Sequence, residues 1–178
     1  MVSKKVSAIK NDELPSRIIT LGEITIESVN EIIHSIYEIN KTATKEPIQL
    51  IINSPGGDIY SGLGLIDVIQ TSETPIHTIC HGSVMSMALI VYVAGHYRLA
   101  GRYATFMYHE ASYQNEGKLK YHKQELKEAE RIELICNEFL ISRSNLSDTQ
   151  IDNVINKRKD WYFNATDALE YGIIDKIL

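Results

Sequence analysis

The chain has 178 residues, of which 44% are hydrophobic and 23% are charged, a balance typical of one globular domain with a substantial core. Its formal net charge is -5 at pH 7, and its 18 Lys and Arg residues are scattered rather than clustered. This distribution argues against nucleic acid or an anionic membrane as the main partner. The longest apolar run, residues 87–95, is too short to span a bilayer, and no long apolar stretch follows Met1 to form a secretory signal.

The first part of the chain carries a strand signal followed by a helix signal. Residues 1–16 are polar and predict a flexible N-terminal segment. Residues 17–21 predict a strand. Thr25 or Glu27 then opens an amphipathic helix, because the apolar residues that follow recur at helical spacing.

The middle of the chain continues this alternation. Residues 47–53 predict a strand buried on both faces, as in parallel sheets, and residues 54–58 form a strong turn signal after it. A second helix follows the turn, and residues 75–80 predict the next strand. The run 84–94 is apolar nearly all round and predicts a buried helix, which leads to a β segment over residues 97–108.

A long amphipathic pattern over residues 117–142 predicts a helix that is longer than a domain of this size usually needs. The pattern fits a solvated surface helix or a helix that projects to a partner subunit, and we favour the second. Ser147 and Asn164 each begin a capping box for a short helix, and residues 173–178 predict a final strand. Alternating strands and helices throughout indicate an α/β fold, with a single domain over residues 17–178.

The two cysteines, Cys80 and Cys136, both lie among apolar residues. Buried free thiols in a reducing compartment are the default interpretation, so we expect a cytoplasmic protein. A disulfide between them stays open at this level, because it depends on geometry.

Ser86 is the most informative residue, because it is a hydroxyl at the start of the apolar run 84–94. Such a serine is either a core residue whose hydroxyl has a hydrogen-bond partner or a nucleophile. The N-terminus of a helix offers unpaired N–H groups and a positive dipole potential, which suit a developing oxyanion.

A nucleophilic serine needs a base, a group that orients the base, and donors for the oxyanion. His109 closes a predicted strand, and His81 competes with it as the base. Asp160, placed before an aromatic run, is a candidate orienter, and Gly56 with Gly57 can bring backbone N–H groups close to a ligand. Each of these residues also has a purely structural interpretation. The histidine can serve the fold alone, Asp160 is typical of a turn, and the two glycines can form a simple turn.

Four ordered motifs carry a resemblance to a known family. The chain resembles the Clp protease proteolytic subunit (ClpP) from roughly Arg17 onward. The motifs are Asn53-Ser54-Pro55-Gly56-Gly57, Gly82-Ser83-Val84-Met85-Ser86-Met87-Ala88, Met107-Tyr108-His109, and Asp160 with Ala165-Thr166-Asp167-Ala168-Leu169-Glu170-Tyr171-Gly172-Ile173-Ile174-Asp175.

The resemblance implies a ClpP/crotonase-like α/β fold of repeated β-β-α units and a serine endopeptidase. Carried over by position, it implies Ser86 as nucleophile, His109 as general base and acid, and Asp160 as the orienting group. It also implies an oxyanion hole from the backbone N–H groups of Gly57 and Met87. The chain itself then needs no metal and no organic cofactor.

The same resemblance implies an assembly. The helix over about 117–142 corresponds to a protruding handle between two stacked homo-heptameric rings, which form a tetradecamer around an enclosed chamber. Unfolded polypeptides or peptides are the implied substrates, and ATP is consumed by a separate AAA+ unfoldase. Three alternatives remain: a viral-type maturation protease, a non-catalytic ClpP-like ring subunit, and a crotonase-type acyl-CoA enzyme. The last predicts binding of coenzyme A, for which the chain has no evident basic patch.

Overall fold

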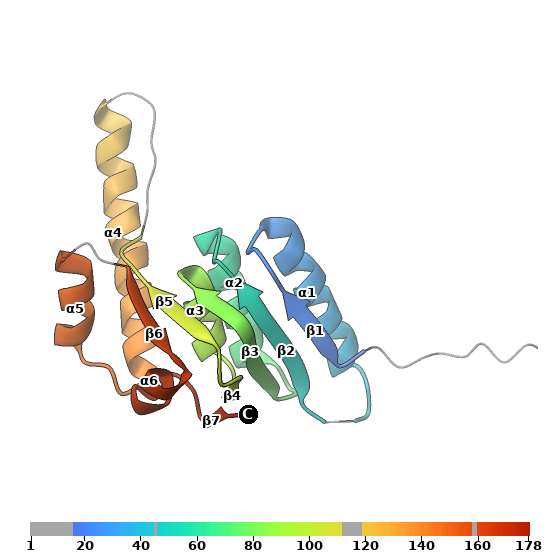
Figure 1. Cartoon of the computed structure of the whole chain (residues 1–178). Coiled ribbons are helices and arrows are strands. Elements are labelled where there is room, and N and C mark those ends of the chain that lie inside the picture. The colour runs from blue at the N-terminus through green and yellow to red at the C-terminus, as the bar shows by residue number, and fades with distance from the viewer. Residues whose placement is uncertain (1–15, 45, 112–118, 158–159) are drawn as a thin grey trace, which may run out of the picture.

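The computed structural model describes residues 16–44, 46–111, 119–157 and 160–178. The flexible segment expected over residues 1–16 lies outside this part of the chain except for Ser16, and it stays a prediction. Strands and helices alternate along the chain as expected (Figure 1). In chain order they are β1 (Ile18–Leu21), α1 (Ile26–Asn40), β2 (Ile48–Ser54), α2 (Ile59–Thr71), β3 (Ile76–Met85), α3 (Met87–Val93), β4 (Tyr97–Ala100), β5 (Thr105–Tyr108), α4 (Leu119–Ser142), α5 (Asp148–Asn156), β6 (Trp161–Asn164), α6 (Ala165–Glu170) and β7 (Lys176–Ile177).

The strands form a mostly parallel sheet in the order β1-β2-β3-β4-β7, with β5 and β6 attached to it. The long strand β3 pairs first with β4, through residues 77–80, and then with β5, through residues 83–85. The change of partner occurs around Gly82, which has a φ of +110°. Strand β6 runs antiparallel to β5 and completes this branch of the sheet. The carboxyl ends of β3 and β5 therefore lie side by side.

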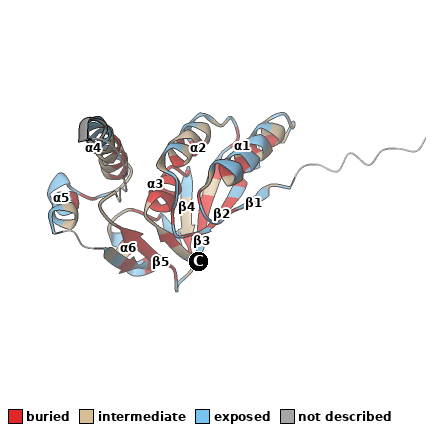
Figure 2. Cartoon of the chain, turned by 90° about the horizontal axis from the view of Figure 1, so that it is seen from above, coloured by how far each residue is buried: buried red, intermediate tan, exposed pale blue. Residues whose placement is uncertain are grey.

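Helices α1 and α2 lie along one face of the parallel strands (Figures 1 and 2). In β2, Ile48, Leu50 and Ile52 are fully buried, whereas Gln49 between them is exposed. The expectation of a strand buried on both faces is therefore wrong, because these helices cover one face only. The buried positions join the core beneath the helices.

The buried helix expected over residues 84–94 begins later than predicted. Val84 and Met85 belong to β3, where they pair with β5, and α3 begins only at Met87. Every residue of α3 is buried, so the apolar pattern predicted burial correctly. It could not separate strand from helix, because a continuous apolar run fits both.

The remaining elements differ from expectation at their ends. The β segment expected over residues 97–108 is two strands, β4 and β5. The final strand expected over 173–178 shrinks to β7, because the N–H groups of Ile173 and Ile174 both donate to the carbonyl of Ala168 at the end of α6. Both predicted capping boxes are confirmed, at Ser147 and at Asn164.

Helix α4 confirms the long amphipathic pattern and extends well beyond the sheet (Figure 1). Residues 117 and 118, where we expected it to begin, lie outside the described residues. Its lower half packs into the core through Ile132, Cys136 and Leu140. Leu126 and Leu134 are more than half exposed, at 52% and 55%.

Candidate active site

Ser86 forms a tight connection between the end of β3 and the start of α3. Its φ of 53° and ψ of -130° make it the one non-glycine residue with a positive φ among the described residues. Its N–H donates to the carbonyl of Met107 at 2.9 Å, and its carbonyl accepts from the N–H of Leu89 at 2.9 Å. Such a strained conformation persists only where the surrounding structure holds it, and strained residues cluster at functional sites.

His109 follows directly after β5, and the pairing of Met85 with Met107 brings it to the serine. Its Nε2 lies 2.7 Å from the Oγ of Ser86, the distance of a hydrogen bond. A serine hydroxyl that donates to a neutral imidazole can pass its proton to it. The competing His81 lies instead within β3, where its ring faces Gly101.

Asp160 lies next to His109 because β6 runs antiparallel to β5. The register pairs Tyr108 with Trp161, so the residue after one strand faces the residue before the other. The Oδ1 of Asp160 is 3.7 Å from the Nδ1 of His109, an ion-pair distance that is longer than a hydrogen bond. The Asp160 side chain is 58% exposed, so its charge acts on the imidazole partly through solvent.

The loop between β2 and α2 brings Gly56 and Gly57 to Ser86. Ile24 holds this loop from one side, because its N–H donates to the carbonyl of Gly56 and its carbonyl accepts from the N–H of Asp58, both at 2.8 Å. The carbonyl of Gly56 and the N–H of Gly57 belong to one trans peptide and point in opposite directions, so the N–H of Gly57 points away from Ile24. The Cα of Gly56 lies so close to Ser86 that an added Cβ would be 2.8 Å from the serine Cβ.

Met87 is the first residue of α3, and its backbone N–H is among those that have no acceptor inside the helix. It follows Ser86 directly, so it lies beside the hydroxyl. The structure thus brings the serine, the histidine and the aspartate together with the two predicted backbone donors, at Gly57 and Met87.

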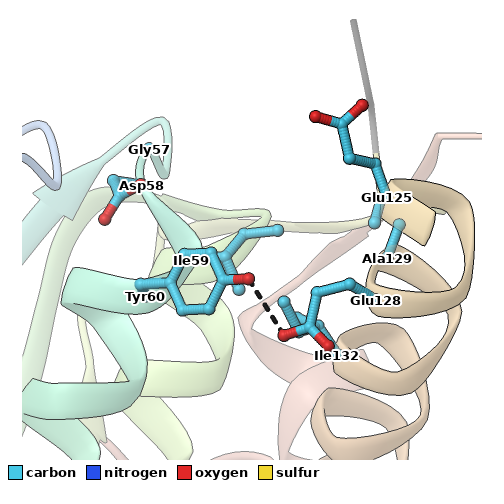
Figure 3. Close-up of a pocket in the computed structure, with 9 residues that line it drawn as sticks. Gly57, Asp58, Ile59, Tyr60, Glu125, Glu128, Ala129 and Ile132 are labelled. Carbon is cyan, nitrogen blue, oxygen red and sulfur yellow. Dashed lines mark hydrogen bonds between the residues drawn. The ribbon is translucent and has the colours of Figure 1, made fainter. Parts of the chain in front are cut away.

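One cavity opens beside Ser86, and a second cavity adjoins it. The smaller, of about 40 Å³, is lined by Ser86, His109, Glu133 and mainly apolar side chains. The larger, of about 380 Å³, lies between the start of α2 and helix α4 (Figure 3). Ile59, Ala111 and Ile132 line both, so the two cavities lie side by side.

Tyr60 and Glu128 connect the two walls of the larger cavity. The Tyr60 hydroxyl donates to Glu128 Oε1 at 3.0 Å, as the dashed line in Figure 3 marks. Hydrogen bonds from Arg131 and then from Tyr60 lower the pKa of Glu128 to about 2, so this carboxylate stays ionised. The larger cavity is therefore lined both by apolar side chains, among them Ile59 and Ile132, and by the ionised carboxylate of Glu128.

The smaller cavity is lined by a thiol, Cys136, and a carboxylate, Glu133, neither of which was assigned to the site from the sequence. Burial, followed by the nearby charge of Glu133, raises the pKa of Cys136 to about 11. Oε1 of Glu133 accepts the N–H of Ala111 at 3.0 Å and so ties the chain after His109 to α4. No local pattern marks Glu133, Cys136 or Ile24 as part of the site, because each reaches it only through the fold.

Both cysteines are free thiols, which answers the question that the sequence left open. Within the described part of the chain, no three His, Cys, Asp or Glu side chains form a group that could hold a metal ion. Over the same residues, none of the helices combines the length and the apolarity that a membrane crossing requires.

Known proteins are similar to this chain over most of its length. The chain is 31% identical over 188 residues to the ATP-dependent Clp protease proteolytic subunit 1 of Prochlorococcus marinus (strain MIT 9312), covering 99% of this chain and 91% of that protein. It is 33% identical over 165 residues to the ATP-dependent Clp protease proteolytic subunit of Mesostigma viride, covering 91% of this chain and 71% of that one.

The model of the Clp protease family matches residues 3–178. The similarity therefore begins earlier than Arg17, where the motifs first indicated it. The chain belongs to the Clp protease family, and this membership supports a serine peptidase.

Proposed function

We propose that this chain is a serine endopeptidase in which Ser86 is the nucleophile, His109 the general base and acid, and Asp160 the orienting group. The observation that carries the proposal is the 2.7 Å contact between Ser86 Oγ and His109 Nε2 at a strained turn. A buried structural serine would not need a positive φ, which costs about 1–3 kcal/mol.

In the proposed mechanism, His109 removes the proton of Ser86 as the hydroxyl oxygen attacks the carbonyl carbon of a peptide bond. The negative charge that develops on the carbonyl oxygen is stabilised by the N–H groups of Gly57 and Met87. His109 then gives its proton to the leaving amine, and water completes the reaction by the same route. Asp160 stabilises the imidazolium through its nearby negative charge.

The proposal includes no metal and no organic cofactor in this chain, because side chains and backbone N–H groups supply each step. The substrates would be peptides or unfolded polypeptides, and nucleic acid and membranes have no part in it. The cavity beside Ser86 and the larger one that adjoins it offer space for substrate side chains.

We further propose that residues 17–178 act as one domain that assembles into homo-heptameric rings, two of which stack into a tetradecamer in the cytoplasm. The long projection of α4, with Leu126 and Leu134 exposed, supports a contact between rings. The relatives are named as subunits of ATP-dependent proteases, which supports a separate AAA+ unfoldase as partner. Light scattering on the purified chain tests this assembly, and a monomer at micromolar concentration would contradict it.

The deciding experiment for the chemistry is labelling of the purified chain with a fluorophosphonate, with the modified residue mapped by mass spectrometry. We expect labelling at Ser86 and none in a Ser86→Ala variant of the same oligomeric size. Ser83 provides an internal control, since it is a nearby serine without a histidine contact among its described hydrogen bonds. Absence of labelling in the assembled wild type would favour a non-catalytic ring subunit.

A further inference from the structure

Ser54 lies at the end of β2, three residues before the backbone donor at Gly57. It is completely buried, with 0% of its surface exposed. It also lies where the register between β2 and β3 shifts, and it pairs there with Val84, two residues before Ser86. Its position links the strand that carries the loop to the strand that carries the nucleophile.

The hydroxyl oxygen of Ser54 accepts the N–H of Gly56 at 3.1 Å, in a buried bond. A buried N–H without an acceptor is unfavourable, so this bond selects the direction in which the loop leaves β2. Serine hydroxyls commonly form such local turns with a backbone N–H two residues ahead.

Three contacts together leave the peptide between Gly56 and Gly57 one orientation. The N–H of Ile24 donates to the carbonyl of this peptide, that of Gly56, and the carbonyl of Ile24 accepts the N–H of Asp58 on the far side of Gly57. The close approach of Gly56 to Ser86 prevents this peptide from moving toward the serine. The Ser54 bond fixes the preceding peptide, between Pro55 and Gly56, because that peptide carries the N–H of Gly56.

We infer that Ser54 is a positioning residue for the oxyanion hole, one that acts on the reaction by aiming the N–H of Gly57. This inference rests on the proposed peptidase function. Ser54 touches neither the substrate nor Ser86 in this role; it fixes the donor before the charge forms. Preorganisation of this kind matters more in the transition state than in the substrate complex.

The test compares Ser54→Ala with Thr78→Val in a fluorogenic peptide assay. Thr78 is an apt control because it is also completely buried and its hydroxyl also makes one buried bond, to the carbonyl of Tyr92 at 2.8 Å. We expect Ser54→Ala to lower kcat by about 10- to 100-fold while KM changes by less than about twofold. The affinity for a peptide boronic acid, which forms a tetrahedral adduct with the serine, should fall by a similar factor. Thr78→Val should change neither kcat nor the affinity for the boronic acid.

A Ser54→Ala enzyme that loses as much thermal stability as Thr78→Val but keeps its kcat would overturn the inference, because Ser54 would then be merely structural. Hydrogen exchange separates this failure from failure of the proposed function. In a Ser86→Ala background, which needs no activity, Ser54→Ala should increase exchange at the amide of Gly56. Unchanged exchange would refute the positioning role, whereas an unlabelled wild type would refute the peptidase function itself.

Discussion

Replacement of Gly56 by alanine tests how closely the loop and the nucleophile depend on each other. The added Cβ would lie 2.8 Å from the Cβ of Ser86, 3.0 Å from the carbonyl oxygen of Met85 and 3.2 Å from the backbone nitrogen of Met87. All three atoms belong to the turn that carries the nucleophile. Gly56 also has a φ of +106°, a conformation that an alanine adopts only with strain.

The size of the effect follows from these distances. Carbon atoms in comfortable contact are about 3.5 Å apart or more, so the turn and the loop must separate by about 0.7 Å. The backbone strain adds about 1–3 kcal/mol to the loss of stability. A displacement approaching 1 Å at a reacting group costs about 100-fold in rate, so we expect Gly56→Ala to retain about 1–10% of the activity.

The assay combines peptide hydrolysis with thermal unfolding, and Gly64→Ala is the matched control. Gly64 lies in α2, and a Cβ there meets no other atom within 4 Å. Alanine in a helix interior stabilises by up to about 1 kcal/mol relative to glycine, so this variant should be fully active and at least as stable as the wild type. Full activity in Gly56→Ala would refute the close packing of the loop on the nucleophile turn.

Three further predictions concern charges and thiols. Asp160→Asn should lower kcat/KM by only about 10-fold, because the carboxylate is exposed and lies 3.7 Å from the imidazole of His109. A loss above about 1,000-fold in kinetic assays would show that Asp160 contacts His109 more tightly than this distance indicates. Asp175 should stabilise the fold at neutral pH: burial raises its pKa, but hydrogen bonds from Arg98 outweigh this effect and hold the pKa below its usual value. The stability that a carboxylate contributes through a lowered pKa is present above its pKa in the unfolded chain and is lost as pH falls through its pKa in the folded chain. Asp175→Asn should therefore lower the free energy of unfolding in urea by about 1–3 kcal/mol at pH 7, and the difference should shrink in acid. Burial raises the pKa of Cys80 to about 12 and that of Cys136 to about 11, so both thiols should react slowly with iodoacetamide at pH 7.5 until the chain is unfolded. Rapid alkylation of the native protein, measured by mass spectrometry, would contradict their burial.

Local patterns predicted most of the elements but not all of their ends. Helix α4 and the two capping boxes were predicted because helical periodicity and capping are properties of neighbouring residues. The boundary between β3 and α3 was misplaced, since Val84 and Met85 are held as a strand by pairing with β5, which begins twenty residues later. The one-sided burial of β2 was missed for a similar reason, because it depends on where the helices pack.

The sequence by itself determined the α/β class and the ordered motifs, because these depend on residue type, order and spacing along the chain. It left His109 and His81 as rival bases on the residues alone. Only the tertiary structure shows which of the two lies at the serine: the pairing of β3 with β5 places His109 Nε2 at 2.7 Å from Ser86 Oγ, while His81 stays within its strand. Ile24 and Glu133 also depend on the fold, because their contacts join segments that no local pattern relates. The bond from Gly56 to Ser54 is local, but only the folded chain buries it beside the strand that carries Ser86.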